Sequence, residues 1–205
     1  MTRQIAQRYW FGATALCAAT GTGVSVYVAV RGPGHFSSGV ERGFNTFAFF
    51  TIISNLIAGG VSLLLAVSPR VNSLVFATFR LSGLVMITVT GIVFHVALAR
   101  LLDLDGVAEF GNQFVHTVVP VLTVAGWLLY GPRGLTSARV AWLSVLIPLA
   151  WLAFTLIRGA VIHWYPYPFL DVDAIGYAKA LLNVAWVSLL LLALAAGATA
   201  LDKHL

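Results

Sequence analysis

The chain has 205 residues, of which 60% are hydrophobic and 9% are charged, and its formal net charge is +5. A soluble domain carries about 25% charged residues, so this composition excludes a soluble domain and, with so many apolar residues, a disordered chain. The 12 cations stand singly, which argues against a nucleic-acid partner, and the lone cysteine, Cys17, excludes a disulfide scaffold.

Six stretches of the chain contain no Asp, Glu, Lys or Arg. In order, they cover residues 10–30, 44–67, 81–99, 114–130, 140–157 and 180–201. A helix needs roughly 20 apolar residues to cross the hydrocarbon core of a bilayer, and its backbone polar groups must bond within the helix. The sequence therefore predicts an all-α fold, a polytopic membrane bundle of six transmembrane helices in a single domain over residues 1–205.

The loops on one side of the predicted bundle carry more cations than the loops on the other. The side that holds both termini has seven, against five on the opposite side. Because cytoplasmic loops are enriched in Lys and Arg, we expect a multi-pass protein of the cell membrane with both termini in the cytoplasm. The seven cations are Arg3, Arg8, Arg70, Arg80, Arg133, Arg139 and Lys203.

Polar side chains recur in five of the predicted spans, and each needs an explanation because lipid favours apolar residues. With cytoplasmic termini, they all fall near the outer end of the bundle, which predicts one outward-facing polar cavity. The main members of this set are Thr51, Asn55, His95, His116, Arg158 and Asn183.

Each of these side chains also has a structural interpretation. Hydroxyl side chains commonly bond the backbone of their own helix, and Asn55 can join two helices. Arg158 can extend its guanidinium to the membrane interface. A single membrane histidine is often a packed residue, but two of them at one membrane end, His95 and His116, favour a functional site.

The loop after the fifth span is rich in proline and aromatic residues. It reads WYPYPFLDV over residues 164–172. The prolines preclude a regular helix, and the aromatic rings suit the membrane interface. The loop is either an interfacial segment or a lid over the cavity, in which Asp171 pairs with Arg158 or orients a histidine.

Three segments carry a family resemblance: Phe50–Leu56 (FTIISNL), His116–Leu122 (HTVVPVL) followed by Trp127, and Arg158-Gly159 with Tyr165–Asp171 (YPYPFLD). Together they resemble the bacterial six-span integral membrane proteins related to the animal androgen-induced proteins, and the six-helix layout matches over essentially the whole chain. The animal pattern lacks the Ser54-Asn55 pair, and the proline-aromatic loop belongs to the bacterial branch.

The animal relatives are membrane hydrolases that cleave fatty acid esters of hydroxy fatty acids with an intramembrane threonine and a histidine. The resemblance implies that Thr51 is the nucleophile and His116 its base. It also implies a hydrophobic acyl substrate among the membrane lipids. We expect no metal and no cofactor. The candidates for oxyanion donors or other supporting roles are Asn55, His95, Arg158, Asn183 and Asp171, with Arg158 suited to a fatty carboxylate.

Two other functions stay open at this point. A non-enzymatic lipid or small-molecule carrier would have the same cavity without turnover. A metal or haem protein would use His95 and His116 as ligands, although no supporting acid or thiol accompanies them in the spans.

Overall fold

The computed structural model describes residues 3–205, and this part of the chain is an all-α bundle. Six helical segments are long and apolar enough to cross a membrane, which confirms the predicted fold class. Five of them are built on one long helix each: α1 (Arg3–Arg31), α3 (Phe50–Val67), α4 (Leu74–Val93), α7 (Ala138–Ile162) and α9 (Tyr177–Leu201).

The fourth segment is composite. It consists of α5 (Gly106–Gln113), a π-helical turn (Phe114–Val118) and α6 (Val119–Tyr130). Helix α4 also continues into a π-helical turn, Phe94–Leu98, which is followed by a 3₁₀ turn, Ala99–Leu101. The remaining short elements are α2 (Gly39–Asn45), two 3₁₀ turns (Thr46–Ala48 and Pro168–Leu170) and α8 (Val172–Ile175).

The predicted second span, 44–67, is wrong at its beginning. Its first residues belong to α2 and to the following 3₁₀ turn, and Phe49 then has an extended backbone with φ −74° and ψ 135°. This stretch lacks charge because it is rich in Phe44, Phe47 and Phe49, and aromatic rings suit the membrane interface as well as its interior. The membrane helix α3 therefore begins only at Phe50.

The other five predicted stretches lie within observed helices that extend beyond them. Helix α1 takes in three arginines, and the side chains of the first two reach the ends of neighbouring helices. Arg3 donates to the carbonyl oxygen of Leu129 at 3.1 Å, and Arg8 donates to that of Ala66 at 2.8 Å. Arginine side chains are long enough to extend from a helix to the membrane edge. A charge-free stretch therefore underestimates the length of the helix that contains it.

Serine side chains define where two of the long helices begin. The side chain of Ser73 accepts a hydrogen bond from the N–H of Phe76, and Ser137 does the same for Val140. Both are N-cap interactions, which satisfy N–H groups that have no partner within the helix. Helix α7 ends at Ile162, and the left-handed backbone of the capping residue His163 (φ 52°) turns the chain into the aromatic loop.

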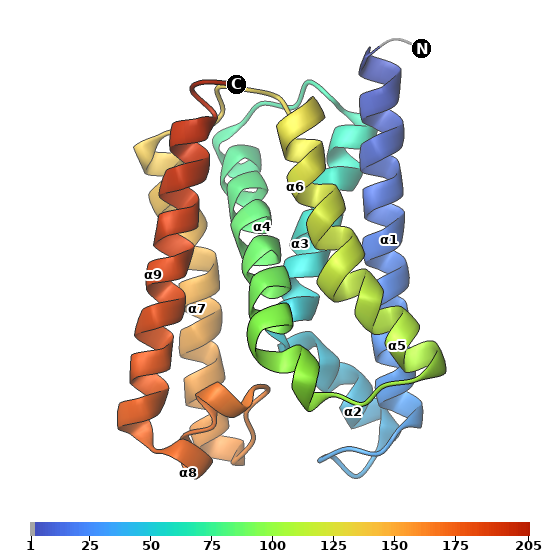
Figure 1. Cartoon of the computed structure of the whole chain (residues 1–205), viewed down its shortest axis with the longest axis vertical. Helices are drawn as coiled ribbons and strands as arrows, with labels where there is room; N and C mark the ends of the chain where they lie inside the picture. Colours follow the sequence, from blue (N-terminus) through green and yellow to red (C-terminus); the bar gives the residue numbers. More distant parts are fainter. Residues whose placement is uncertain (1–2) are drawn as a thin grey trace.

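Helix α4 runs through the middle of the bundle (Figure 1). It packs against α3 and α6 on one side and against α7 and α9 on the other, and more than half of its apolar segment is buried. Leu81, Val85 and Met86 of α4 form the core there with Trp127 and Leu191. Helix α1 covers the outer side of α3, α5 and α6.

Glycines let α1 approach the fourth segment closely. A Cβ atom on Gly111 would lie 2.6 Å from Val24 Cγ1, and one on Gly21 would lie 2.8 Å from Phe114 Cβ. Small residues permit this kind of backbone approach between membrane helices. The approach places the π-helical turn Phe114–Val118 against α1 and α3.

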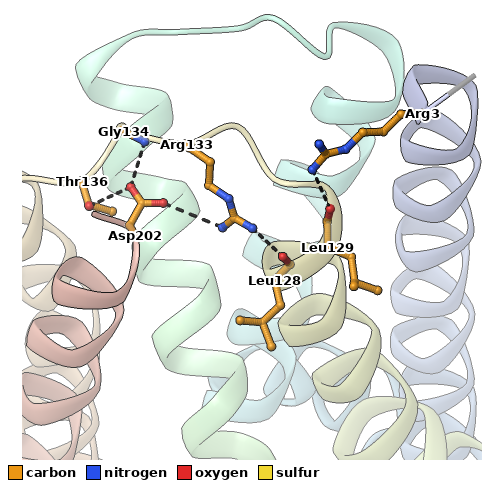
Figure 2. A network of polar contacts seen from close by, with 7 residues as sticks. All are labelled: Arg3, Leu128, Leu129, Arg133, Gly134, Thr136 and Asp202. Atoms are coloured by element: carbon orange, nitrogen blue, oxygen red, sulfur yellow. Dashed lines mark hydrogen bonds and ion pairs between the residues drawn. The ribbon is translucent and has the colours of Figure 1, made fainter. Parts of the chain in front are cut away.

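Helix α1 begins and α9 ends at the same end of the bundle, here called the termini end (Figure 1). A polar network closes that end, as Figure 2 shows. Asp202 accepts hydrogen bonds from the Gly134 N–H at 3.1 Å and the Thr136 hydroxyl at 2.9 Å, and it lies 3.9 Å from Arg133 Nη1. Arg133 in turn donates to the carbonyl oxygen of Leu128, so the loop after α6 is held to α9.

Large apolar side chains point outward along the bundle. Leu16 is 68% exposed, Val96 80%, Ile157 69% and Trp186 65%. A soluble monomer rarely exposes contiguous apolar surface of this kind, whereas a lipid-facing surface requires it. Together with the six apolar segments, this surface makes the chain a multi-pass membrane protein.

Candidate functional site

Thr51 and His116 meet near the end of the bundle opposite the termini end. Thr51 is the second residue of α3, and His116 is the middle residue of the π-helical turn Phe114–Val118. Thr51 Oγ1 lies 3.2 Å from His116 Nε2, and Thr51 is only 7% exposed. A hydroxyl and an imidazole from separate spans are therefore within the distance that proton transfer between them requires.

Asn112 determines which nitrogen of the His116 ring carries the proton. His116 Nδ1 lies 2.8 Å from Asn112 Oδ1 and 3.2 Å from the main-chain oxygen of the same residue. A main-chain carbonyl oxygen only accepts hydrogen bonds, so Nδ1 is the protonated nitrogen in the neutral ring. The lone pair of Nε2 then points to Thr51, whose hydroxyl is the donor.

Glu109 holds the Asn112 side chain in this orientation. Asn112 Nδ2 donates to Glu109 Oε2 at 3.3 Å, which leaves Asn112 Oδ1 facing His116. The hydrogen bonds therefore run in one direction, from Thr51 through His116 and Asn112 to the carboxylate. A nucleophile, an imidazole and an orienting amide in this order are the parts that a cysteine hydrolase of the Cys-His-Asn type uses.

The two π-helical turns face each other across the site. Phe94, the first residue of one, stacks on the His116 ring in the other, with ring centroids 3.9 Å apart and 14° between the planes. A π-helical turn changes the direction of the side chains that follow it and is frequent at functional sites. Phe94 thus restrains the face of the imidazole while Asn112 restrains its edge.

Tyr167 of the aromatic loop contacts the nucleophile candidate twice. Its hydroxyl oxygen lies 3.2 Å from Thr51 N and 3.2 Å from Thr51 Oγ1. The first is a main-chain N–H in the opening turn of α3, where such groups lack partners within the helix and the helix dipole is positive. Burial raises the pKa of the Tyr167 phenol, so the phenol remains protonated and can donate a hydrogen bond.

Asn55 joins α3 to the turn that carries His116. Its Nδ2 donates to the carbonyl oxygens of Thr51 at 2.8 Å and Val115 at 3.0 Å. Ser54 Oγ donates to the same Thr51 oxygen at 2.8 Å. Both N–H groups of the Asn55 amide are used, so this residue sets the spacing between Thr51 and His116 and has no free donor for a substrate oxygen.

An apolar cavity of about 580 Å³ has Thr51 and His116 in its wall. The wall is formed by α1, α3, α5, the two π-helical turns, the segment 46–49, the loop after Phe94–Leu98 and the aromatic loop. The volume falls within the range of small-molecule sites, about 300–1,000 Å³. A smaller space of about 30 Å³ adjoins the same pair and reaches Thr90 and Trp151. The hydroxyl and imidazole are therefore accessible to an apolar ligand.

His95 and Asn183 lie outside this arrangement. His95 is exposed, and its Nε2 contacts the hydroxyl of Thr117 at 3.2 Å. Asn183 donates to the carbonyl oxygen of Phe169 at 2.8 Å, which ties α9 to the aromatic loop. Neither side chain contacts Thr51 or His116 in the described part of the chain.

Arg158 and Asp171 are also placed elsewhere. Arg158 donates to Asn45 Oδ1 at 2.7 Å, and its guanidinium lies 5.3 Å from the Trp164 ring centroid. It lines a different cavity, of about 510 Å³, beside α2. Asp171 caps α8 by accepting from the Ala174 N–H, and across residues 3–205 it forms neither an ion pair with Arg158 nor a contact with a histidine.

The sequence predictions did not include Asn112, Glu109 or Tyr167. The spacings of Glu109, Asn112 and His116 (i, i+3 and i+7) place all three on one helical face, which is a readable signal. This spacing was not recognised because the predicted span starts at residue 114, which assigns Glu109 and Asn112 to a loop. Tyr167 belonged to the loop interpreted as a lid, but nothing in the sequence relates that loop to α3.

No family model, no curated protein and no solved structure matches this chain. Among residues 3–205, no group of three or more His, Cys, Asp and Glu side chains is arranged to hold a metal ion. The fold and the site geometry therefore stand on the chain's own residues. The chain is a helical multi-pass membrane protein in which a buried Thr51 and the half-buried His116 and Asn112 are joined by hydrogen bonds beside an apolar cavity.

Proposed function

We propose that this protein is an intramembrane threonine hydrolase of lipid esters. The observation that carries the proposal is the 3.2 Å contact between Thr51 Oγ1 and the unprotonated nitrogen of His116 in the wall of an apolar cavity. The resemblance to the bacterial relatives of the androgen-induced proteins names the same two residues. A threonine hydroxyl is a weak nucleophile, and an adjacent base is what activates it.

The reaction uses the existing hydrogen bonds in sequence. Thr51 Oγ1 attacks the ester carbonyl carbon while its proton passes to His116 Nε2, and the bond to the leaving alkoxide breaks as His116 returns that proton to it. Water then attacks the acyl-threonine, giving one proton to His116, and the acid leaves as Thr51 regains its proton. Asn112 keeps the imidazole in the required tautomer during both halves.

The opening turn of α3 supplies the means to stabilise the oxyanion. The Thr51 N–H and the Tyr167 phenol both lie beside Thr51 Oγ1, and the helix N-terminus adds a positive field. In the observed arrangement these two groups bond each other. A substrate carbonyl oxygen that enters between them would accept from both.

The test is ester cleavage by purified, folded protein and its variants. Thr51→Ala and His116→Ala should each lower kcat by about 10³-fold or more, as loss of a nucleophile or base does in serine hydrolases. A fluorophosphonate probe should modify Thr51 in the native protein and should fail to do so in His116→Ala. Full cleavage activity in either alanine variant would exclude the mechanism.

A lipid carrier without catalysis is the second candidate, and the size of the apolar cavity is the observation that favours it. A carrier would bind lipid in both the native protein and Thr51→Ala, with no turnover and no probe modification in either. The two candidates therefore give opposite results in the same set of assays.

A further inference from the structure

The cavity beside Thr51 has no charged wall. Among residues 3–205, no Asp, Glu, Lys or Arg side chain lines it. A charged group that enters such a space loses its hydration without gaining a partner, and this is strongly unfavourable. The wall therefore selects against a ligand with an ionised group inside the cavity.

The hydroxyl donors of the cavity wall outside the reacting centre are already bonded to main-chain oxygens. The Ser25 hydroxyl donates to the carbonyl oxygen of Gly21 at 2.8 Å, and the Thr46 hydroxyl donates to that of Arg42 at 3.0 Å. Asn112 is occupied by His116 and Glu109. Among the described residues of the wall, the side-chain donors left for a ligand are then those of the reacting centre.

The charges closest along the chain to the cavity wall are mostly acidic. Leu102 and Leu104 line the cavity, and the exposed Asp103 and Asp105 alternate with them in the same loop. The Glu109 carboxylate stands behind Asn112. Over residues 98–112 these three acids outnumber the single cation, Arg100, and this excess of negative charge disfavours the approach of an anionic ligand.

Two other cations of this end, Arg42 and Arg158, are committed to other partners. Arg158, the residue that the sequence suggests for a fatty carboxylate, is bound to Asn45 and lines the separate cavity beside α2. Arg42 donates to the carbonyl oxygens of Ala29, Phe36 and Ser37. Neither guanidinium lines the cavity that contains Thr51.

We infer that the site takes uncharged esters, in which both chains flanking the scissile bond are apolar, and rejects esters that carry a carboxylate. This inference rests on the proposed function for the cleavage step, but it concerns recognition and is testable by binding alone. It also separates this chain from hydrolases of fatty acid esters of hydroxy fatty acids, because those substrates have a free carboxylate.

Three matched ligands provide the test: decyl decanoate, the same ester with a carboxylate at the far end of its alcohol chain, and the methyl ester of that carboxylate. Each carries a diazirine in the acyl chain for photo-crosslinking to the protein in phosphatidylcholine nanodiscs. Thr51→Ala is used for binding so that no ligand is consumed, and the native protein is used for turnover.

We expect the carboxylate ligand to crosslink at least about tenfold less than the other two. The methyl ester, which is slightly larger, should restore crosslinking and so exclude size as the cause. Equal crosslinking of the carboxylate ligand would overturn the inference. Selective crosslinking of the two neutral ligands without any turnover would support the inference and exclude the hydrolase.

A cation placed in the wall should weaken the preference for neutral ligands. Leu104 lies in a loop and is half-buried, so Leu104→Lys can be tolerated, with Leu104→Gln as the uncharged control. Leu104→Lys should reduce the ratio of neutral to carboxylate crosslinking by about tenfold, and Leu104→Gln should leave that ratio unchanged. An unchanged ratio in Leu104→Lys would count against an electrostatic origin of the selectivity and would overturn the inference.

Discussion

Substitution of Asn112 tests whether catalysis depends on a hydrogen bond beyond the two reacting side chains, Thr51 and His116. Without its amide, His116 Nδ1 keeps only the longer, 3.2 Å bond to a main-chain oxygen, and the ring is free to rotate or to change tautomer. We expect Asn112→Ala to lower kcat by about 10²-fold with a small effect on KM, because the amide acts through His116 and does not hold substrate.

Gln113→Ala is the matched control for this variant. Gln113 is the next residue of α5 and donates to the same Glu109 carboxylate, but it has no bond to His116. Its loss should change kcat by less than about threefold, within the usual effect of an exposed substitution. A similar loss of activity in both variants would assign the effect of Asn112→Ala to the stability of α5 alone.

Substitution of Tyr167 tests whether its phenol and the Thr51 N–H stabilise the oxyanion. Tyr167→Phe keeps the ring stacked on Phe169 but removes the hydroxyl that lies 3.2 Å from both Thr51 atoms. If the phenol donates to the developing oxyanion, kcat should fall by about 10²-fold while KM changes little. A rise in KM at unchanged kcat would instead show that the residue only shapes the cavity.

Tyr167→Phe should also change how the stability of the fold depends on pH in the alkaline range. Burial raises the pKa of Tyr167 in the folded protein, so folding favours the protonated phenol, and this contribution is complete below the unfolded pKa of about 10 and is lost as the pH rises further. Thermal unfolding followed from pH 8 to about pH 11 should show a less steep loss of stability for Tyr167→Phe than for the native protein. Parallel curves would contradict a buried, protonated phenol.

At the scale of the helical elements, the distance between α1 and α5 controls the position of Asn112. A Cβ on Gly111 would lie 2.6 Å from Val24 Cγ1 and 3.1 Å from Val24 Cβ, and a valine side chain cannot move aside without moving α1. Gly111→Ala should destabilise the fold by about 1–3 kcal/mol and lower activity, because α5 and Asn112 are displaced together.

Gly60→Ala is the control for helix propensity, since a Cβ at that position of α3 meets no atom within 4 Å. It should leave activity intact and raise stability by about 0.5–1 kcal/mol. The comparison is made by thermal unfolding in detergent together with ester cleavage. Equal behaviour of the two alanine variants would exclude a specific contact between α1 and α5.

The elements also show what the sequence can predict. Charge-free stretches identified six spans because the cost of burying charge in lipid is large and acts on every residue of a span. They did not identify the break at Phe49 or the two π-helical turns, because these depend on contacts between distant segments, such as Phe94 with His116 and Asn55 with Val115. The contact of Tyr167 with α3 was likewise unpredictable, since 116 residues separate the two.

At the scale of the whole molecule, the two ends of the bundle differ in construction. At the termini end, arginines donate to carbonyl oxygens at the ends of helices, as Arg3 and Arg133 do, and Asp202 closes the surface. The opposite end contains the cavity and its apolar wall. Of the cations counted in the loops of the termini end, Arg80 is in fact buried in α4, with 5% exposure. Without Arg80, the prediction of a cytoplasmic termini end rests on six cations against five.

The predicted orientation would place the cavity in the outer leaflet, and cysteine labelling tests this prediction. In a Cys17→Ser background, Asp103→Cys reports the opposite end and Ser68→Cys reports the termini end, and both positions are exposed. A maleimide that cannot cross membranes should label Asp103→Cys in intact cells and Ser68→Cys only after the cells are opened. The positive-inside rule acts on cations near the spans, so neither substitution removes the bias that sets the orientation. Labelling of Ser68→Cys in intact cells would invert the topology and would place the source of any ester substrate in the cytoplasmic leaflet.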